Sequence, residues 1–255
     1  MYRVKAGLIH LLGSCLLAAL AVTLVFRVWY PAPLSDAVGV TSIFLLILGV
    51  DVVLGPLLTT IVYRPGKPSL RFDLACIVVV QMIAFGYGLW TVSQGRPAWL
   101  VYNANRFDLV QAYELDTRKL EAVPDAYRSA PWWGARWVAA EIPKDLQQRS
   151  DLTLEAVFAG LDVPQRPNLY RPLESFADDL RKHAQPLAEL DKLNDPAAVR
   201  EWLQANPQAD AWLPMMARIQ PMVVLINKAQ ARVVGPFRSS PGVEGGSVEL
   251  RSPEW

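Results

Sequence analysis

The sequence predicts a membrane protein in which three N-terminal transmembrane α-helices precede a mixed α+β extracytoplasmic domain. Its 255 residues are 52% apolar and only 19% charged, which is more apolar than an ordinary soluble domain. Residues 1–96 contain ten Asp, Glu, Lys or Arg residues, whereas residues 97–255 contain thirty-nine. We therefore expect a transmembrane domain over 1–96, a periplasmic α+β domain over 97–240 and, because it is rich in Ser, Gly and Pro, a flexible tail over 241–255.

Three apolar stretches are long enough to cross a bilayer. Residues 8–26 contain no charged side chain, residues 41–63 contain one, Asp51, and residues 74–92 contain none. Nineteen helical residues cover about 28 Å, close to the thickness of the hydrocarbon core. Lipid offers no partners for backbone polar groups, so helices are expected here even where Val and Ile are frequent. The first stretch exceeds the ~7 to 15 apolar residues of a signal peptide, which favours an uncleaved anchor.

The basic residues predict the orientation of these spans. One side carries five of them and the other side two: Arg3, Lys5, Arg64, Lys67 and Arg71 against Arg27 and Arg96. The side with more positive charge is expected to face the cytoplasm, so the N-terminus lies inside and three spans deliver the rest of the chain outside. In a Gram-negative cell this is the inner membrane, with the C-terminal domain in the periplasm. Both cysteines, Cys15 and Cys76, fall within spans, so the outer domain has no disulfide.

A carboxylate inside a span needs a reason, because an ionised one at the bilayer centre costs roughly 2.5 to 3.5 kcal/mol. Asp51 lies near the middle of the second span, and Gly55 lies one turn later on the same face, where it leaves room for a neighbouring helix. Pro56 is expected to kink the helix and free the carbonyl of Val52.

The third span offers polar and small residues at a similar depth. Gln81 lies near the midplane, and Ala84 and Gly88 form a small-xxx-small surface. A bond between Asp51 and Gln81 would join the two helices. Three interpretations of the acid compete: a buried interhelical pin, which is favoured; a transport role, which a single carboxylate supports poorly; and a groove that receives the transmembrane helix of another protein.

The outer domain is predicted to be mixed. Two strands are expected around the turn at residues 103–105, another strand within 132–143, a short helix from Asp151, and a helix opened by a capping box of Ser175 and Asp178. Asp195 and Pro196 are typical of a helix start. A closing hairpin is expected over residues 212–237, with its bend at residues 228–230.

The common catalytic spacings are missing from the sequence. It contains no HExxH, GxSxG, GxGxxG, GxxxxGK[ST] or CxxC motif. Its two histidines, His10 and His183, are too far apart to predict a metal triad or a Cys–His nucleophile. We expect no enzyme activity, cofactor or metal, and the absence of a strongly basic region argues against nucleic acid. Trp132, Trp133 and Trp137 are more typical of core or interfacial packing than of a sugar or peptide platform.

Several segments resemble a known family. They are KAGLIHLL (5–12), VWYPAPL (28–34), residues 50–75 and residues 87–110, with a looser match over residues 212–235. The most specific block runs from Asp51, Gly55 and Pro56 to a cytoplasmic loop motif of Lys67, Arg71 and Asp73. On these residues the chain resembles the TfpX/TfpZ type IV pilin accessory proteins. The bend at residues 227–230 departs from the family pattern, which leaves the register of the last strands open.

The resemblance implies an inner-membrane factor that binds or stabilises a cognate type IV pilin and modulates its assembly into surface pili, without enzyme activity. The expected partners are the lipid bilayer, the transmembrane helix of the pilin and its head domain, and other pilus assembly components. The candidate helix-interaction site is Asp51, Gly55, Pro56, Gln81, Ala84 and Gly88. The alternatives are a membrane-anchored sensor or structural protein with a periplasmic ligand-binding domain and, third, a membrane hydrolase.

Overall fold

The computed structural model describes residues 2–192 and 194–238, and these fall into two compact units. The first unit comprises the residues up to Ser35 together with Gly39–Arg96. The second comprises Asp36–Val38 together with the residues from Pro97 onward.

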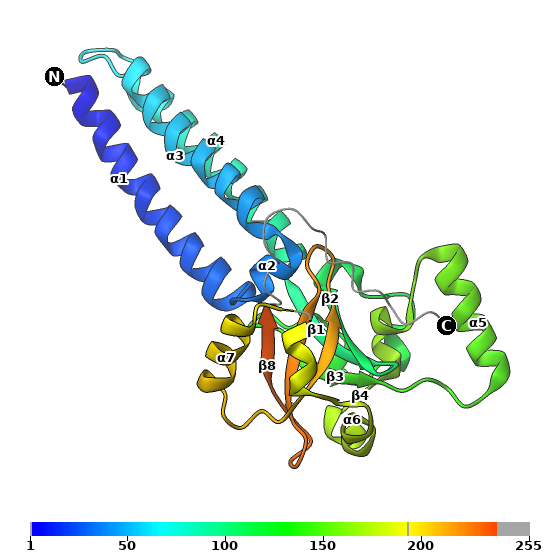
Figure 1. The fold of residues 1–255 in the computed structure, drawn as a ribbon. Coiled ribbons are helices and arrows are strands. Elements are labelled where there is room, and N and C mark those ends of the chain that lie inside the picture. The colour runs from blue at the N-terminus through cyan, green and yellow to red at the C-terminus, as the bar shows by residue number, and fades with distance from the viewer. Residues whose placement is uncertain (1, 193, 239–255) are drawn as a thin grey trace. The chain divides into compact units, whose positions relative to one another are not determined.

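The first unit is built from three long helices (Figure 1). Helix α1 (Tyr2–Thr23) continues into a π-helical segment (Leu24–Trp29), and after the short helix α2 (Leu34–Val38) come α3 (Val40–Val62) and α4 (Leu70–Gln94). By length and composition the segments Tyr2–Trp29, Val40–Val62 and Leu70–Gln94 can each cross a membrane. The expected three-span architecture is confirmed, and each helix contains most or all of the apolar stretch predicted for it.

Most apolar side chains of these helices point away from the unit. Leu12, Leu46 and Ile83 are 78%, 69% and 68% exposed, and only a few residues of each helix are buried. A water-soluble helix would bury such a face against a core. Exposure of this extent around three long apolar helices is the pattern of a protein anchored in lipid.

The second unit is built around one mixed sheet with strand order β4-β3-β1-β2-β6-β7-β8, in which β5 also pairs with β6. The strands are β1 (Pro97–Asn103), β2 (Arg106–Gln111), β3 (Arg136–Ala140), β4 (Tyr170–Arg171), β5 (Gln185–Pro186), β6 (Ala211–Met216), β7 (Met222–Asn227) and β8 (Arg232–Arg238). Two pairings, β1 with β3 and β2 with β6, are parallel, and the others are antiparallel. The sheet thus combines hairpins with longer crossovers.

The first hairpin forms where the sequence predicts it. Strands β1 and β2 pair from Asn103–Arg106 outward, and the two turn residues Ala104 and Asn105 adopt positive φ angles of 46° and 69°. Such angles at both central positions match the right-handed twist of the flanking strands, and Asn tolerates them better than most residues. The turn therefore fixes which side chains of β1 face the core.

Three helices and several 3-10 turns connect the strands. The helices are α5 (Leu146–Ala159), α6 (Ala177–His183) and α7 (Pro196–Ala205); the 3-10 turns are Ala112–Glu114, Leu120–Ala122, Asp125–Tyr127, Val163–Gln165, Pro167–Leu169, Leu173–Phe176 and Leu187–Lys192. The helix start at Asp195 and Pro196 is confirmed, since the Asp195 carboxylate accepts a hydrogen bond from the Ala197 N–H at 3.0 Å.

Two predicted helix starts are wrong. Helix α5 begins at Leu146 rather than Asp151, because the Asp145 carboxylate caps it by accepting the Gln148 N–H at 2.9 Å. The capping box of Ser175 and Asp178 does not form. The Ser175 hydroxyl instead donates to the Pro172 carbonyl at 2.6 Å, within the 3-10 turn that precedes α6.

The final segment forms three strands rather than the single hairpin expected. The bend at residues 228–230 does connect β7 to β8, but a second turn at 217–221 separates β6 from β7. Pro221 and the charged Arg218 interrupt what reads as a continuous apolar stretch. The predicted tail over 241–255 lies outside the described residues.

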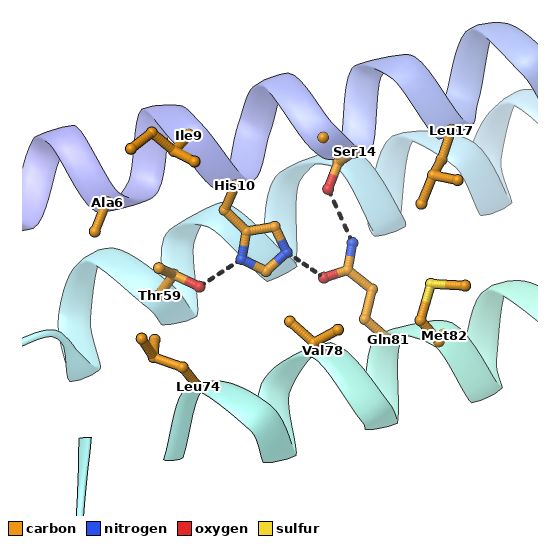
Figure 2. A pocket seen from close by; sticks show the side chains of 11 residues that line it. Ala6, Ile9, His10, Ser14, Leu17, Thr59, Leu74, Val78, Gln81 and Met82 are labelled. Atoms are coloured by element: carbon orange, nitrogen blue, oxygen red, sulfur yellow. Dashed lines mark hydrogen bonds between the residues drawn. The ribbon is translucent and has the colours of Figure 1, made fainter. Parts of the chain in front are cut away.

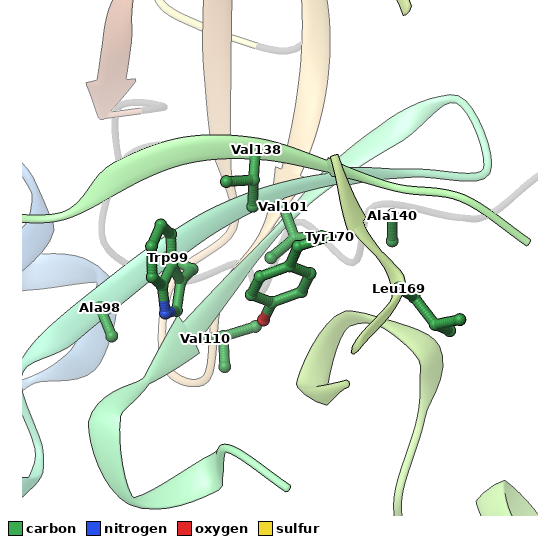
Figure 3. Packing of buried hydrophobic residues seen from close by; sticks show 8 residues of the cluster. All are labelled: Ala98, Trp99, Val101, Val110, Val138, Ala140, Leu169 and Tyr170. Carbon is green, nitrogen blue, oxygen red and sulfur yellow. The ribbon is translucent and has the colours of Figure 1, made fainter. Parts of the chain in front are cut away.

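One core cluster of the second unit joins buried residues of β1, β2 and β3 to Leu169 and Tyr170 (Figure 3). Trp99 and Tyr170 are 1% and 0% exposed, their ring centroids lie 5.5 Å apart, and the Tyr127 ring stands edge-on to both at 5.7 and 5.9 Å. The Tyr170 hydroxyl donates to the Pro164 carbonyl at 2.5 Å. Aromatic burial, together with a second apolar cluster around Trp212, therefore forms the core of the sheet unit.

Candidate helix-binding site in the membrane region

A hollow of about 540 Å³ opens along the helices of the first unit (Figure 2). Its walls come from α1 and α4, and Thr59 of α3 lies between them. The lining side chains are mainly apolar, with a short row of polar groups: Ala6, Ile9, His10, Gly13, Ser14, Leu17, Thr59, Leu74, Val78, Gln81 and Met82. Helix α3 packs along both α1 and α4, and the hollow lies between α1 and α4.

One side chain, Gln81 of α4, links all three helices. Its amide nitrogen donates to the Ser14 hydroxyl of α1 at 3.0 Å and to the Asp51 backbone carbonyl of α3 at 3.1 Å. Its amide oxygen lies 2.9 Å from the Nε2 atom of His10, and the other ring nitrogen of His10, Nδ1, lies 2.6 Å from the Thr59 hydroxyl. These bonds, drawn in part in Figure 2, form what we call the Gln81 junction: His10, Ser14, Asp51 O, Thr59 and Gln81.

The junction assigns roles to the His10 ring. The Gln81 amide oxygen can only accept, so Nε2 of His10 must carry a proton. The other ring nitrogen, Nδ1, forms its hydrogen bond with the Thr59 hydroxyl. Both ring nitrogens of His10 are therefore engaged within the junction.

Glycines make the junction possible. A β-carbon at Gly55 would overlap the Gln81 amide oxygen, and one at Gly7 would overlap the Thr60 hydroxyl. Because Gly55 has no side chain, Gln81 passes close to α3 and reaches the Asp51 carbonyl. Small residues are the usual means by which membrane helices approach one another.

The predicted bond between Asp51 and Gln81 forms, but through the backbone carbonyl of Asp51 and not through its side chain. Asp51 also lines a different hollow of about 340 Å³ between α3 and α4. Gln81 has only two amide protons, and both are taken by Ser14 and the Asp51 carbonyl. The interhelical pin expected of Asp51 is therefore made by its main chain.

The other predicted site residues, Ala84, Gly88 and Pro56, do not gather in one place. Ala84 lines the smaller hollow with Asp51, Gly55 and Gln81. Gly88 admits Ile47 of α3, whose Cγ2 atom would lie 2.9 Å from an added β-carbon. Pro56 is buried in α3, which continues through it, and its carbonyl accepts the Thr60 hydroxyl at 2.8 Å.

The predicted loop motif forms a local ion pair. The Lys67 ammonium group lies 2.6 Å from the Asp73 carboxylate, to which the Ser69 hydroxyl also donates at 3.1 Å. Arg71 is exposed and lies beside them in sequence, in the first turn of α4. The ion pair therefore links the loop that follows α3 to the first turn of α4.

Sequence reasoning missed three members of the junction: His10, Ser14 and Thr59. Attention to formal charge pointed to Asp51, whereas the helices are joined by neutral polar groups. One usable signal was present, since His10 and Ser14 lie one turn apart in an otherwise apolar stretch and so share a helix face.

In the second unit, helix α5 has no fully buried residue, and ion pairs join it to the rest of the fold together with the partly buried Leu152. Glu155 of α5 lies 2.7 Å from the guanidinium group of Arg166, whose side chain is only 4% exposed, and 3.2 Å from that of Arg118. The hydrogen bond from Arg166 lowers the pKa of Glu155, and that from Arg118 lowers the pKa of Asp116. The apolar residues Leu146, Val157 and Phe158 of α5 stay exposed.

Three carboxylate residues line a hollow of about 620 Å³ in the second unit, and each forms an ion pair or a hydrogen bond. Glu141 pairs with Arg171 at 2.8 Å, Asp178 with Arg181 at 2.7 Å, and Asp179 accepts the Tyr102 hydroxyl at 2.8 Å. Burial and the bond to Asp179 raise the pKa of Tyr102. Each carboxylate of this hollow therefore already has a partner that holds it in place.

The tryptophan cluster is dispersed. Trp137 packs edge-on against Phe107, with ring centroids 5.0 Å apart, whereas Trp132 and Trp133 are 53% and 84% exposed. Packing against another ring is thus observed for Trp137, and an interfacial position for Trp132 and Trp133 stays a prediction. Among the described residues no group of three His, Cys, Asp or Glu side chains could hold a metal ion.

Comparison with known proteins identifies relatives of this chain by sequence. A family model described as fimbrial assembly protein FimB matches residues 1–39. The chain is 30% identical to the fimbrial assembly protein of serogroup E1 from Dichelobacter nodosus over 89% of this chain and 92% of the relative. It is 32% identical to the serogroup I protein of the same organism over 74% of each chain. No solved structure matches. The chain therefore belongs to the family of fimbrial assembly proteins.

Proposed function

We propose that this protein is an inner-membrane accessory factor of type IV pilus biogenesis that binds or stabilises a cognate pilin and modulates its assembly into surface pili. The observation that carries the proposal is the similarity to fimbrial assembly proteins, which extends over 89% of the chain and so includes both units. The resemblance of residues 1–110 to type IV pilin accessory proteins supports the same role.

The hollow between α1 and α4 is the part of the membrane region best suited to a helical partner. It is apolar along its walls, and Gly13 leaves an empty space there, since nothing lies within 4 Å of an added β-carbon. Helices associate in lipid by close packing and by polar bonds, because no hydrophobic drive acts between them. We expect the apolar helix of a pilin subunit to pack along α4, whose residues line both this hollow and the smaller hollow beside Asp51.

The outer unit is proposed to lie in the periplasm and to contact the pilin head. The basic residues beside the spans support this orientation. The exposed apolar side chains of α5, with Phe158 84% exposed and Val157 72% exposed, support a contact surface. In this role the protein acts by binding alone and catalyses no reaction.

Co-purification tests the proposal. The full-length protein is solubilised in mild detergent from cells that express the pilin, and the pilin that accompanies it is quantified along with surface pili. We expect Gly13→Phe, which fills the hollow, to reduce co-purified pilin at least fivefold. Gly86→Phe is the matched control, because Gly86 is a helical glycine with equally open surroundings and lies outside the hollow.

The outcomes separate clearly. Failure of the wild-type protein to retain any pilin would refute pilin binding, and equal retention by both variants would refute the assignment of the hollow. A reporter that is active only in the periplasm, fused to the C-terminus, tests the orientation. Activity of a cytosolic reporter in its place would refute it.

A further inference from the structure

The carboxylate of Asp51 is the one charged group at the centre of α3, with eleven helical residues on either side of it. Its backbone carbonyl is used by the Gln81 junction. Within the described part of the chain, no side chain or backbone N–H donates a hydrogen bond to its carboxylate, and no basic group pairs with it. Such a group is costly in lipid unless something outside the chain compensates it.

The surroundings of this carboxylate are hollow and apolar. Asp51 lines the space of about 340 Å³ between α3 and α4, together with Leu54, Leu58, Val80 and Ala84. Leu54 and Val80 are 50% and 66% exposed, so the hollow is continuous with the lipid-facing surface. A partner can therefore approach the carboxylate from the membrane without any rearrangement of the junction.

We propose that this hollow, on the basis of the pilin-binding role above, receives a transmembrane helix that brings a cation or another strong hydrogen-bond donor to the depth of Asp51. Charge complementarity determines the occupant: lipid tails supply no donor, and a helix with no donor at this depth would leave the carboxylate uncompensated. A helix that does supply one replaces the missing partner at the centre of the bilayer. Asp51 is thus a recognition residue, and Gln81 with the small residues shapes the hollow around it.

The proposal makes a prediction that a structural role does not. An internal pin loses stability when it is removed, whereas a carboxylate without a partner in its own chain destabilises the free protein. Asp51→Leu should therefore keep or raise the thermal unfolding temperature of the purified protein and lower pilin capture at least fivefold. Asp51→Asn, which retains two acceptor lone pairs but no charge, should fall between wild type and Asp51→Leu.

The chain carries its own pair of reporter positions. Cys76 lines the Asp51 hollow, whereas Cys15 is exposed on α1 and lines neither hollow. Two full-length single-cysteine variants, Cys15→Ser and Cys76→Ser, are labelled with a thiol-attached photocrosslinker in membranes that contain the pilin. We expect a pilin adduct from the probe on Cys76 at a yield at least five times that from Cys15, and loss of the Cys76 adduct in the Asp51→Leu background.

Each result decides the proposal. A Cys76 adduct that depends on the Asp51 carboxylate, in a protein of unchanged stability, supports it. An adduct that persists in Asp51→Leu, or a clear fall in unfolding temperature, overturns it, the second because Asp51 would then be structural. Pilin that co-purifies but is captured only from Cys15 overturns this inference while pilin binding stands. Pilin that neither co-purifies nor is captured refutes the proposed function itself.

Discussion

The membrane helices and the sheet unit are stabilised by different kinds of contact. Between the helices, glycines allow close approach and a single glutamine carries polar bonds to both α1 and α3, while most large apolar side chains face outward. In the sheet unit, Trp99, Tyr127 and Tyr170 pack edge to face, and the small polar contacts are secondary. The same chain thus places its aromatic rings inside one unit and its leucines outside the other.

This difference follows from the solvent that each unit meets. In water, removal of apolar area is worth roughly 25 cal/mol per Å², so large rings in a core contribute most. In lipid that term vanishes between helices, and close packing with polar bonds takes its place. The two units should therefore respond in opposite ways to loss of bulk and to addition of bulk.

Replacement of a large side chain by a small one should have its largest effect in the sheet unit. We expect Trp99→Ala to lower the free energy of unfolding of the sheet unit by about 3 to 5 kcal/mol, because the cavity would remain between Tyr127 and Tyr170. Chemical denaturation followed by near-ultraviolet circular dichroism measures this. Trp133→Ala is the control: its ring is 84% exposed, and its substitution should change the free energy by less than about 0.5 kcal/mol.

The pH dependence of stability gives a second test of the sheet unit, because this unit contains a largely buried carboxyl group, that of Asp108. Burial, opposed by Arg106 and assisted by Asp162, raises the pKa of Asp108 to about 6. A raised carboxyl pKa means that the folded state holds the proton more tightly than the unfolded state, whose pKa is about 3.9. Stability from this group is greatest below pH ~4 and falls by about 2 to 3 kcal/mol as the pH rises to ~6.

The difference between wild type and Asp108→Asn isolates this term from the other carboxylates. Asp116 and Glu155 have lowered pKa values and act in the opposite direction, so they reduce stability as the pH falls. We expect the two unfolding curves to diverge between pH 4 and 6. Parallel curves over that range would show that Asp108 is not buried as described.

Addition of bulk should have its effect in the membrane unit. Gly55→Ala places a methyl group where the Gln81 amide oxygen lies, and we expect a loss of about 1 to 3 kcal/mol, the usual cost of overpacking. Gly49→Ala, on the same helix but with open space around it, should be neutral or slightly stabilising. Steric trapping or thermal unfolding in detergent measures both, and equal effects would argue against close approach at Gly55.

The smallest expected effect is the loss of the junction itself. Gln81→Leu removes the bonds to His10, Ser14 and the Asp51 carbonyl. Polar bonds between membrane helices average about 0.6 kcal/mol each, so we expect a loss of about 1 to 2 kcal/mol. A change in the unfolding temperature of the helical unit with an unchanged near-ultraviolet spectrum of the sheet unit would fit this, whereas no change would show that packing alone holds the helices.

Patterns that depend on local chemistry were readable from the sequence. The three spans follow from long apolar stretches, and the first hairpin follows from the turn residues at 103–105. The helix start at Pro196 follows from its capping aspartate. The helix starts at residues 146 and 177 were missed, because a competing cap at Asp145 and a hydroxyl bond to Pro172 decide them. Such local competition has no signature in apolar periodicity.

The membrane site was predicted only in part. Gly55 and Gln81 were identified correctly as a meeting point, since both are unusual within an apolar span. The partners of Gln81 could not be identified, because rotation of each helix about its axis determines which polar atoms face one another. The same rotation places the backbone carbonyl of Asp51, and not its side chain, in hydrogen-bond contact with Gln81.

Gln81 of α4 forms hydrogen bonds with both His10 and Ser14 of α1, and these two bonds fix the position of α1 along α4. His10 and Ser14 are one turn apart, and the positions one turn before and after them are Ala6 and Ala18. A slide of α1 by one turn, about 5.4 Å, would leave one of the two glutamine atoms facing an alanine methyl group. Sliding in either direction therefore loses a hydrogen bond, and α1 has a single preferred axial position beside α4.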